Sequence, residues 1–319
     1  MGAAAVRAET RIEPPMRVAS QAPLQSTRLA LVPASAGYLR AGEVRLELTD
    51  TWTNVWVNQR PAMLLDYEAV ELRLSATWAV SDTWSLQMDI DERRRLGGAL
   101  DASIQNFHRL IGNGLNGRES VPRNGVHIEV RDPDTGQVKL LLNDEGTFSR
   151  GVSATVGRSK RLLGGRATLG ATFRVPLRHA GEELATGSDI GVSAGWSGKI
   201  SGSSVHLGAG VARLGRVEVD YPIRRIQKTA LAAYMHPLTP RTAAVLQYLY
   251  NDGTARSGPL GRDIHEITIG GRFHISPRTS VDFGLIENVL HYDNGPDVGV
   301  HLGISRIWPS TKTRVEDVR

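Results

Sequence analysis

One carboxylate and one imidazole in the middle of the chain have a spacing that suits acid–base chemistry. Asp101 and His108 are seven residues apart, about two helical turns, in residues 99–111, where apolar residues recur at helical spacing. Such a pair could relay a proton, but Ser103 does not lie on the same helix face. We therefore keep Asp101 and His108 as weak catalytic candidates and expect the protein not to be an enzyme.

The histidines of the second half of the chain could bind a metal only if the fold gathered them. They are dispersed, and none follows the H-E-x-x-H spacing of zinc enzymes. A closed barrel could bring His206 and His274 to its inside, where a solvated imidazole is the simpler interpretation. We predict no metal site and no cofactor.

Charged residues of both signs recur on one face of the predicted strands. A strongly selective pore is expected to carry rings of one sign. Mixed signs instead predict salt bridges across an interior, which leave either a narrow passage or none. The predicted interior residues are Arg45, Glu47, Glu71, Arg73, Asp89, Asp91, Arg166, Arg174, His206, Glu266, Arg272, His274 and Asp282.

These residues lie in segments that alternate with a period of two. In Ala69–Val80 every even position is apolar, while the odd positions are charged, polar or small. Several such runs reach about ten residues, the length that a tilted strand needs to cross a bilayer. The other face is rich in Gly, Ser and Thr, as a confined lumen favours. A soluble β-sandwich is the alternative, and it would put long Lys and Glu side chains on its solvent face.

The alternation predicts an all-β, transmembrane, antiparallel up-and-down barrel of about twelve strands. Short and long connections alternate between the strands, as periplasmic turns and outer loops do in bacterial outer-membrane barrels. This parity places both termini in the periplasm. The predicted strands are 44–57, 68–80, 84–92, 151–157, 166–177, 189–197, 203–212, 227–236, 242–250, 264–275, 279–288 and 298–308.

Two turns predict pairs of opposite charge inside the barrel. A turn centred on Asp82 brings Asp91 opposite Arg73, and one centred on Pro277 brings Arg272 opposite Asp282. The aromatic residues fall near the strand ends, as interfacial belts require, although they could also be core anchors. The predicted interfacial residues are Trp56, Trp78, Trp84, Trp196, Tyr248 and Trp308.

The long connection 92–150 has structure of its own. The helical segment 99–111 is followed by a hairpin, Val126–Arg131 and Val138–Leu142 around Pro133-Asp134-Thr135-Gly136. We expect helix and hairpin to form an extracellular lid. Its basic residues could contact lipopolysaccharide phosphates or belong to an ordinary solvated loop. They are Arg93, Arg94, Arg95, Arg109, Arg118 and Arg123.

The two ends lack the alternation. Residues 1–42 read as an arm at the periplasmic mouth or a plug, and Ala3–Glu9 fits the end of a signal peptide as well as an ordinary terminus. Residues 309–319 form a periplasmic tail after the barrel, 43–308. The 319 residues contain no cysteine and carry a net charge of +5. Disulfides and thiolate metal sites are therefore excluded, and nucleic acid is a poor candidate partner.

One block of sequence resembles a known family. Leu64–Trp84, Gly97–Asp101, Ile104, Phe107-His108 and Gly117-Arg118 are similar to a Gram-negative family catalogued only as a domain of unknown function. Ser20–Leu24 resembles its start, so the resemblance spans about residues 16–308. It implies an outer-membrane barrel inserted by the barrel-assembly machinery, and no activity. Such barrels often end on an aromatic residue, whereas here Trp308 is followed by a tail.

These patterns favour a porin-like outer-membrane protein. The leading hypothesis is a narrow or gated channel, transporter or ligand-binding barrel for a small solute or a lipid-like molecule. A lipid- or lipopolysaccharide-modifying enzyme and a structural barrel with a sealed lumen are the alternatives. Outer-membrane lipid and lipopolysaccharide are the expected surroundings.

Overall fold

Long antiparallel strands make up nearly all of the regular structure. The computed structural model describes residues 12–33, 39–98, 117–118, 121, 124–132, 134–177, 187–217, 219–290 and 295–310. Its strands are β1 (Val44–Gln59), β2 (Met63–Ala79), β3 (Trp84–Leu96), β4 (His127–Arg131), β5 (Val138–Leu142), β6 (Gly146–Leu162), β7 (Gly165–Pro176), β8 (Asp189–Ile200), β9 (Ser203–Arg213), β10 (Ile226–Pro237), β11 (Thr242–Asn251), β12 (Ile264–Ser276), β13 (Thr279–Asn288) and β14 (Val298–Trp308).

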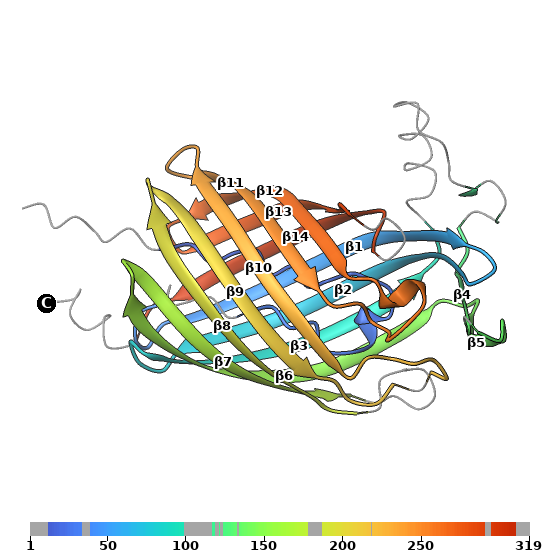
Figure 1. Ribbon diagram of the computed structural model, residues 1–319. Helices are drawn as coiled ribbons and strands as arrows, with labels where there is room; N and C mark the ends of the chain where they lie inside the picture. The colour runs from blue at the N-terminus through green and yellow to red at the C-terminus, as the bar shows by residue number, and fades with distance from the viewer. Residues whose placement is uncertain are drawn as a thin grey trace, which may run out of the picture.

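Twelve of these strands form a closed barrel. Each pairs with its neighbours in the chain, β3 pairs with β6, and β1 closes the ring against β14. Closure leaves no free edge, so every strand pairs on both sides. The predicted twelve-stranded antiparallel barrel is therefore confirmed (Figure 1).

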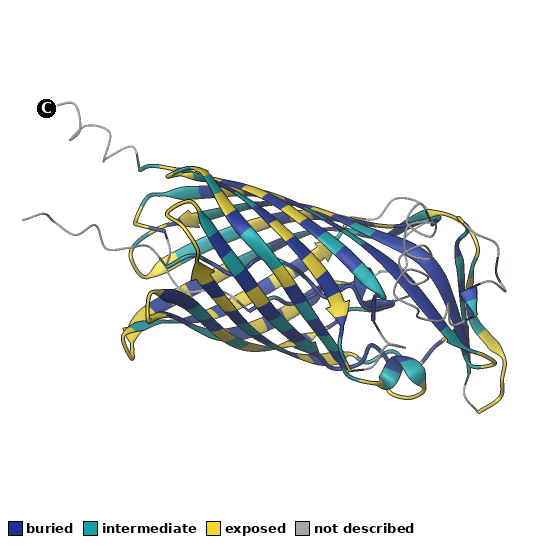
Figure 2. Cartoon of the chain, turned by 90° about the horizontal axis from the view of Figure 1, so that it is seen from above, coloured by how far each residue is buried: buried dark blue, intermediate teal, exposed yellow. Residues whose placement is uncertain are grey.

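Burial alternates along the strands as the sequence predicts. On β2, Leu72 and Leu74 are about half exposed, at 48% and 50%, whereas Arg73 between them is 5% exposed. Figure 2 shows the same alternation around the wall. Outward positions of the wall are mostly apolar and inward positions are mostly polar or charged, so the outer surface of the barrel is mainly apolar. Both predicted registers are present, with Arg73 opposite Asp91 and Arg272 opposite Asp282.

The two ends of the barrel differ. We call the end with the short turns the turn end and the end with the long connections the loop end. The wall is taller at the loop end than predicted, because β3 continues to Leu96 and β6 begins at Gly146. At the turn end, the predicted connection 158–165 is wrong. Leu163 and Gly164, with φ of 50° and 71°, make a two-residue turn between β6 and β7.

The predicted hairpin is present at the loop end. β4 pairs with β5 and also with residues Met63–Asp66 of β2, so the sheet continues beyond the barrel. The predicted helix 99–111 lies outside the described residues. The part of the chain that the structure describes contains 3-10 turns at Gln25–Thr27 and Pro259–Gly261 but no α-helix. The helical half of the lid is therefore unsupported, and no described helix is long and apolar enough to cross a membrane.

Candidate functional site

The N-terminal arm, which we define as residues 12–33, lies inside the barrel (Figure 1). Almost all of its described residues are buried, including Met16 at 0% and Gln25 at 0% exposure. It contains a 3-10 turn and no strand, so it does not add to the sheet. The lumen is therefore occupied by a segment that is held through individual side-chain contacts.

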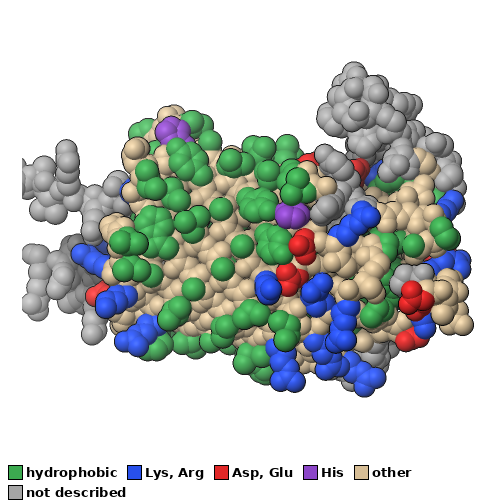
Figure 3. All heavy atoms as spheres, viewed as in Figure 1, with side chains coloured by type: hydrophobic (Ala, Val, Ile, Leu, Met, Phe, Trp, Pro, Cys, Tyr) green, Lys and Arg blue, Asp and Glu red, His purple; other side chains and the backbone are tan. Residues whose placement is uncertain are grey.

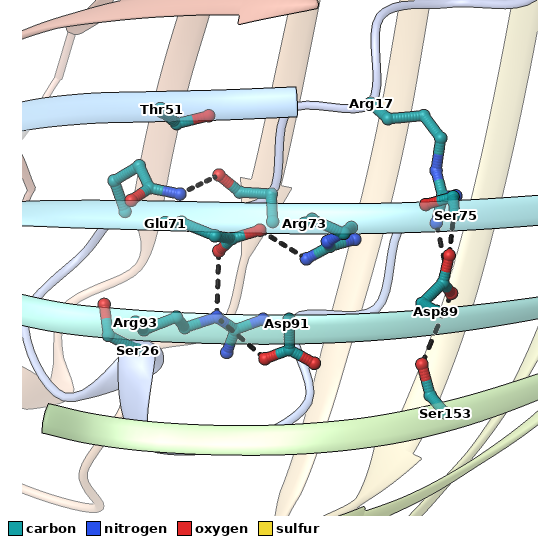
Figure 4. A network of polar contacts seen from close by, with 12 residues as sticks. Arg17, Ser26, Thr51, Glu71, Arg73, Ser75, Asp89, Asp91, Arg93 and Ser153 are labelled. Carbon is teal, nitrogen blue, oxygen red and sulfur yellow. Dashed lines mark hydrogen bonds and ion pairs between the residues drawn. The ribbon is translucent and has the colours of Figure 1, made fainter. Parts of the chain in front are cut away.

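The first limb of the arm, which contains Arg17 and Gln21, runs from the turn end toward the loop end. Arg17 donates to Asp89 at 2.8 Å and to Ser75 at 2.7 Å, on the neighbouring strands β3 and β2 (Figure 4). Further along, the backbone N–H of Gln21 donates to Glu266 at 2.9 Å. These contacts tie the limb to opposite parts of the wall, which fixes its position across the lumen.

The second limb of the arm, which contains Leu29, Leu31 and Pro33, returns along β8 and β9. The N–H of Leu29 donates to Asp189 at 2.7 Å. A Cβ at Gly210 would lie 2.7 Å from Leu31, and one at Gly208 would lie 2.5 Å from Pro33. Side chains at these two glycines would collide with the arm. The wall is therefore shaped to receive the returning limb.

A chain of charges crosses the lumen wall at mid-height. Glu71 forms ion pairs with Arg73 at 2.5 Å and with Arg93 at 2.8 Å (Figure 4). Asp91 forms ion pairs with Arg93 at 3.5 Å and with Arg174 at 2.9 Å. Arg73 and Asp91 are opposite each other in register, as predicted, but their ion pairs are made with these other residues. Asp189 lies 3.9 Å from Arg174, so three carboxylates accompany the three arginines. The signs are mixed, and the chain of charges presents no ring of one sign to a passing ion.

The same chain of charges holds the tip of the arm. Arg93 donates to the carbonyl of Arg28, and Ser149, which receives a hydrogen bond from Arg174 at 3.2 Å, donates to the carbonyl of Ser26 at 2.7 Å. Buried charges paired in this way are costly to separate. The wall charges and the arm backbone therefore form one connected network.

A second charged group lies on β12, β13 and β1. Arg272 binds Asp282 through two contacts of 2.6 and 2.7 Å, and it also reaches Glu13 of the arm at 3.2 Å. Arg45 pairs with Glu47 at 2.7 Å on β1. All the wall residues of this group are buried, so buried ion pairs line the lumen on this part of the wall as well.

The remaining predicted interior residues have different surroundings. Glu266 is buried and binds the arm, whereas His274, partly exposed, lies 3.9 Å from Glu13. Arg166 lies at the turn end, where it donates to the carbonyl of Asp82. His206 and His274 both face inward, but the described residues contain no group of three metal-ligating side chains.

His206 does meet a hydroxyl, which bears on the enzyme alternative. Its Nδ1 is 2.8 Å from Ser197 Oγ on β8, and both residues are buried. Among the described residues, no carboxylate hydrogen-bonds to the ring, as a catalytic triad requires. Gly191–Gly195 fits the G-x-S-x-G pattern, but it lies inside β8 and not at a strand-to-helix turn. Asp101 and His108 lie outside the described residues.

The predicted interfacial aromatics divide between exposed and covered positions. Trp78, Trp84 and Trp308 are exposed by 45%, 44% and 40% at the turn end, and Trp196 there donates to the carbonyl of Leu162. At the loop end, Tyr248 contacts His265, while Trp56 is buried under the Arg118 guanidinium, whose carbon is 5.0 Å from the ring centroid. Trp56 is therefore covered by the protein itself.

An apolar cluster, which we call the mouth core, lies at the loop end of the barrel. It joins Leu24 at the arm tip to the β1 and β2 ends, the β4–β5 hairpin and the loops after β9 and β11. Apolar side chains packed together exclude water from this opening. Its members are Leu24, Val55, Val57, Met63, Leu65, Tyr67, Ala69, Val126, Ile128, Val130, Leu140, Phe148, Tyr221, Ala255 and Leu260.

Several of the residues that hold the arm were not predicted. Arg17, Gln21 and Arg28 belong to a segment without periodicity, so no pattern predicts their partners. Asp189 begins an alternating strand on its inward face, and this parity could have identified it as an interior residue. The arm contacts join residues far apart in the chain, which no local pattern specifies.

A closed barrel of an even number of strands, apolar outside and polar inside, defines the class of outer-membrane β-barrels. The chain belongs to the family described as "Protein of unknown function (DUF3187)", which matches residues 3–308. No curated protein sequence matches the chain.

Solved structures share the architecture at very low sequence identity. The NanC porin is 9% identical, with a TM-score of 0.47 over 82% of this chain and 98% of its own. The toluene transporter TbuX of Ralstonia pickettii is 10% identical, with a TM-score of 0.44 over 92% and 100%. The translocator domain of the autotransporter NalP from Neisseria meningitidis is 7% identical, with a TM-score of 0.44 over 84% and 89%. These values carry no information about function.

Proposed function

We propose that this protein is a gated outer-membrane channel for a small polar solute, with the N-terminal arm as its gate. The observation that carries the proposal is the burial of residues 12–33 inside a barrel whose wall binds them. In this state the arm fills the lumen and the mouth core closes the loop end. The structure is then the closed state of the channel.

The contacts between the arm and the wall favour a removable gate over a permanent plug. The arm makes no strand pairing, so its release breaks separate hydrogen bonds and ion pairs, such as Arg17 with Asp89. The wall side chains that it would uncover are charged or hydroxylated. A polar solute could replace the arm contacts one by one, whereas an apolar solute would leave buried charges without partners.

The orientation is part of the proposal. In bacterial barrels the short turns are periplasmic and the long loops are outside. The turn end, the start of the arm and Trp308 would then face the periplasm, and the hairpin β4–β5 would face outward. Insertion would use the barrel-assembly machinery.

Liposome swelling tests the channel function. We expect intact protein to admit small sugars slowly and a variant lacking residues 12–33 to admit them faster. For that variant, the rate of entry should fall as solute size rises. A second variant lacks residues 12–33 and, in addition, has residues 127–142 replaced by a flexible linker, which removes the hairpin part of the mouth core. The Arg40→Gln variant, altered outside the lumen, should match the intact chain.

Folding of each variant is checked by the shift of its electrophoretic mobility on heating. If both folded deletion variants admit solute no faster than the intact chain, the gated channel is wrong and the barrel is sealed by its own wall.

A further inference from the structure

The basic residues of the outer loop do not form a free basic surface. Arg93 and Arg95 are 2% and 8% exposed, and Arg118 is 3% exposed and contacts Asn54 and Asp297 at 2.6 and 2.8 Å. Arg94 is the exposed member among those described, and Arg109 and Arg123 lie outside the described residues. The cationic surface at the loop end must therefore be sought elsewhere.

Exposed cations gather instead over β9, β10 and the loops that follow β9 and β11. Figure 3 shows Lys and Arg side chains in a group beside the apolar surface of the barrel. We call this group the basic rim. Its exposed members are Arg213, Arg216, Arg225, Lys228 and Arg256.

The basic rim surrounds a cavity of about 560 Å³, lined by Arg216, Arg225 and Arg256 together with Tyr221. This volume lies within the usual range for small-molecule sites. Asp220 also lines the cavity, and its carboxylate is bound by Lys139 at 2.8 Å. Among the described lining residues, the arginines therefore outnumber the acid, and the acid has a cationic partner outside the cavity lining.

The cavity is built on a fixed framework. The N–H of Arg256 donates to the carbonyl of Pro222 at 2.8 Å, and that of Leu214 donates to the carbonyl of Arg225 at 2.7 Å. Tyr221 is 7% exposed and belongs to the mouth core. Burial raises the pKa of its phenol, so this part of the lining stays neutral. The framework holds the arginines without help from a ligand.

The rim adjoins the apolar surface directly. Arg213 is opposite both Ile226 and Ile190 in the sheet, and these isoleucines are 59% and 54% exposed. Val211, two residues before Arg213 on β9, also points outward and is 39% exposed. A ligand lying here meets cations at one end and an apolar wall at the other, which matches a phosphorylated headgroup with acyl chains.

We propose that the basic rim and its cavity bind the phosphorylated headgroup of an outer-leaflet glycolipid, such as lipopolysaccharide. Arginine is well suited to the role because its planar donor fork matches phosphate oxygens. The acyl chains lie along β8, β9 and β10. The site rests on the proposed orientation of the barrel but not on the gate.

Binding to detergent-solubilised full-length protein tests the site, with bis-phosphorylated lipid A as the probe and its dephosphorylated form as the comparison. We expect the double variant Arg225→Gln, Arg256→Gln to lower the affinity for the phosphorylated probe by about tenfold, since it removes two charged donors. The matched variant Arg241→Gln, Arg278→Gln changes two exposed arginines at the turn end and should bind as the intact chain does.

Three results would overturn the proposal. They are equal affinities of the rim variant and the intact chain, equal binding of the phosphorylated and dephosphorylated lipid, and displacement of the lipid by millimolar inorganic phosphate. The last result would mean a site for a soluble phosphate compound.

Labelling of whole cells tests the orientation of the barrel, on which the glycolipid site depends, independently of the gate. The chain has no cysteine, so a cysteine at Gln137 in the hairpin or at Asp82 in a turn is the only thiol. An impermeant maleimide should label Gln137→Cys and not Asp82→Cys. The reverse pattern would place the rim at the inner leaflet and refute the glycolipid site, while the swelling test of the gate would stand.

Discussion

Single residues show how strictly the barrel separates its faces, and Asp50 is an exception. It lies on the outward face of β1, opposite Leu72 and Leu302, which are 48% and 49% exposed. One oxygen of its carboxylate is buried and has no hydrogen-bond partner among the described residues. A carboxylate on the lipid face lowers stability, because lipid cannot solvate it as water does.

We predict that Asp50→Leu stabilises the barrel in lipid vesicles. The free energy of unfolding, measured with guanidinium chloride, should rise by on the order of 1 kcal/mol. Asp82→Leu, at an exposed turn, is the control and should give no gain. A lower unfolding free energy for Asp50→Leu would show that the carboxylate serves a bound partner in the membrane.

Contacts between single residues are predictable from the sequence where a turn sets the register. The salt bridge of Arg272 with Asp282 follows from the turn at Pro277, because alternation leaves one register that keeps both residues inside. The partners of Arg73 and Asp91 were less predictable. Long side chains reach diagonally and along a strand, so register alone does not choose between neighbours.

Among the elements, the arm and its receiving strands are matched in shape. Gly208 and Gly210 leave space that Pro33 and Leu31 fill, as their close approach shows. A larger residue at position 210 would compete with the arm for the same space. Overpacking of this kind costs about 1–3 kcal/mol.

We predict that Gly210→Val loosens the arm. In a chain carrying Ser26→Cys as its only thiol, maleimide labelling should accelerate about tenfold, the equivalent of 1.4 kcal/mol. Ala209→Val adds the same side chain on the outward face and should leave the rate unchanged. If the two valine variants label at one rate, the fit of the arm to β9 does not hold it in place.

The strands were predictable and the arm was not, for physical reasons. A strand that crosses a membrane must alternate along its whole length, so each one carries its own signal. The strand ends at the loop end, as in β3 and β6, extend beyond the apolar belt and lose that signal. The arm is held by contacts distant in sequence, so only the folded barrel defines its path.

For the whole molecule, the proposed closed state has three layers. The apolar belt faces lipid, the wall charges face inward, and the arm with the mouth core fills what remains. Release of the arm would expose Asp89 and Arg272, which now bind Arg17 and Glu13. In this proposal, movement of the arm, and not of the wall, opens the lumen.

Single-channel conductance in planar bilayers tests whether the arm opens the lumen. The variant Glu13→Gln, Arg17→Gln weakens the arm contacts, and cysteines at Leu31 and Gly210, whose side chains would be in contact, add a reversible tether. We predict rare openings for the intact chain, frequent openings for the weakened variant, silence when its tether is oxidised, and recovery on reduction. Equal conductance with the tether oxidised or reduced, or silence of every variant, would contradict the arm as the gate.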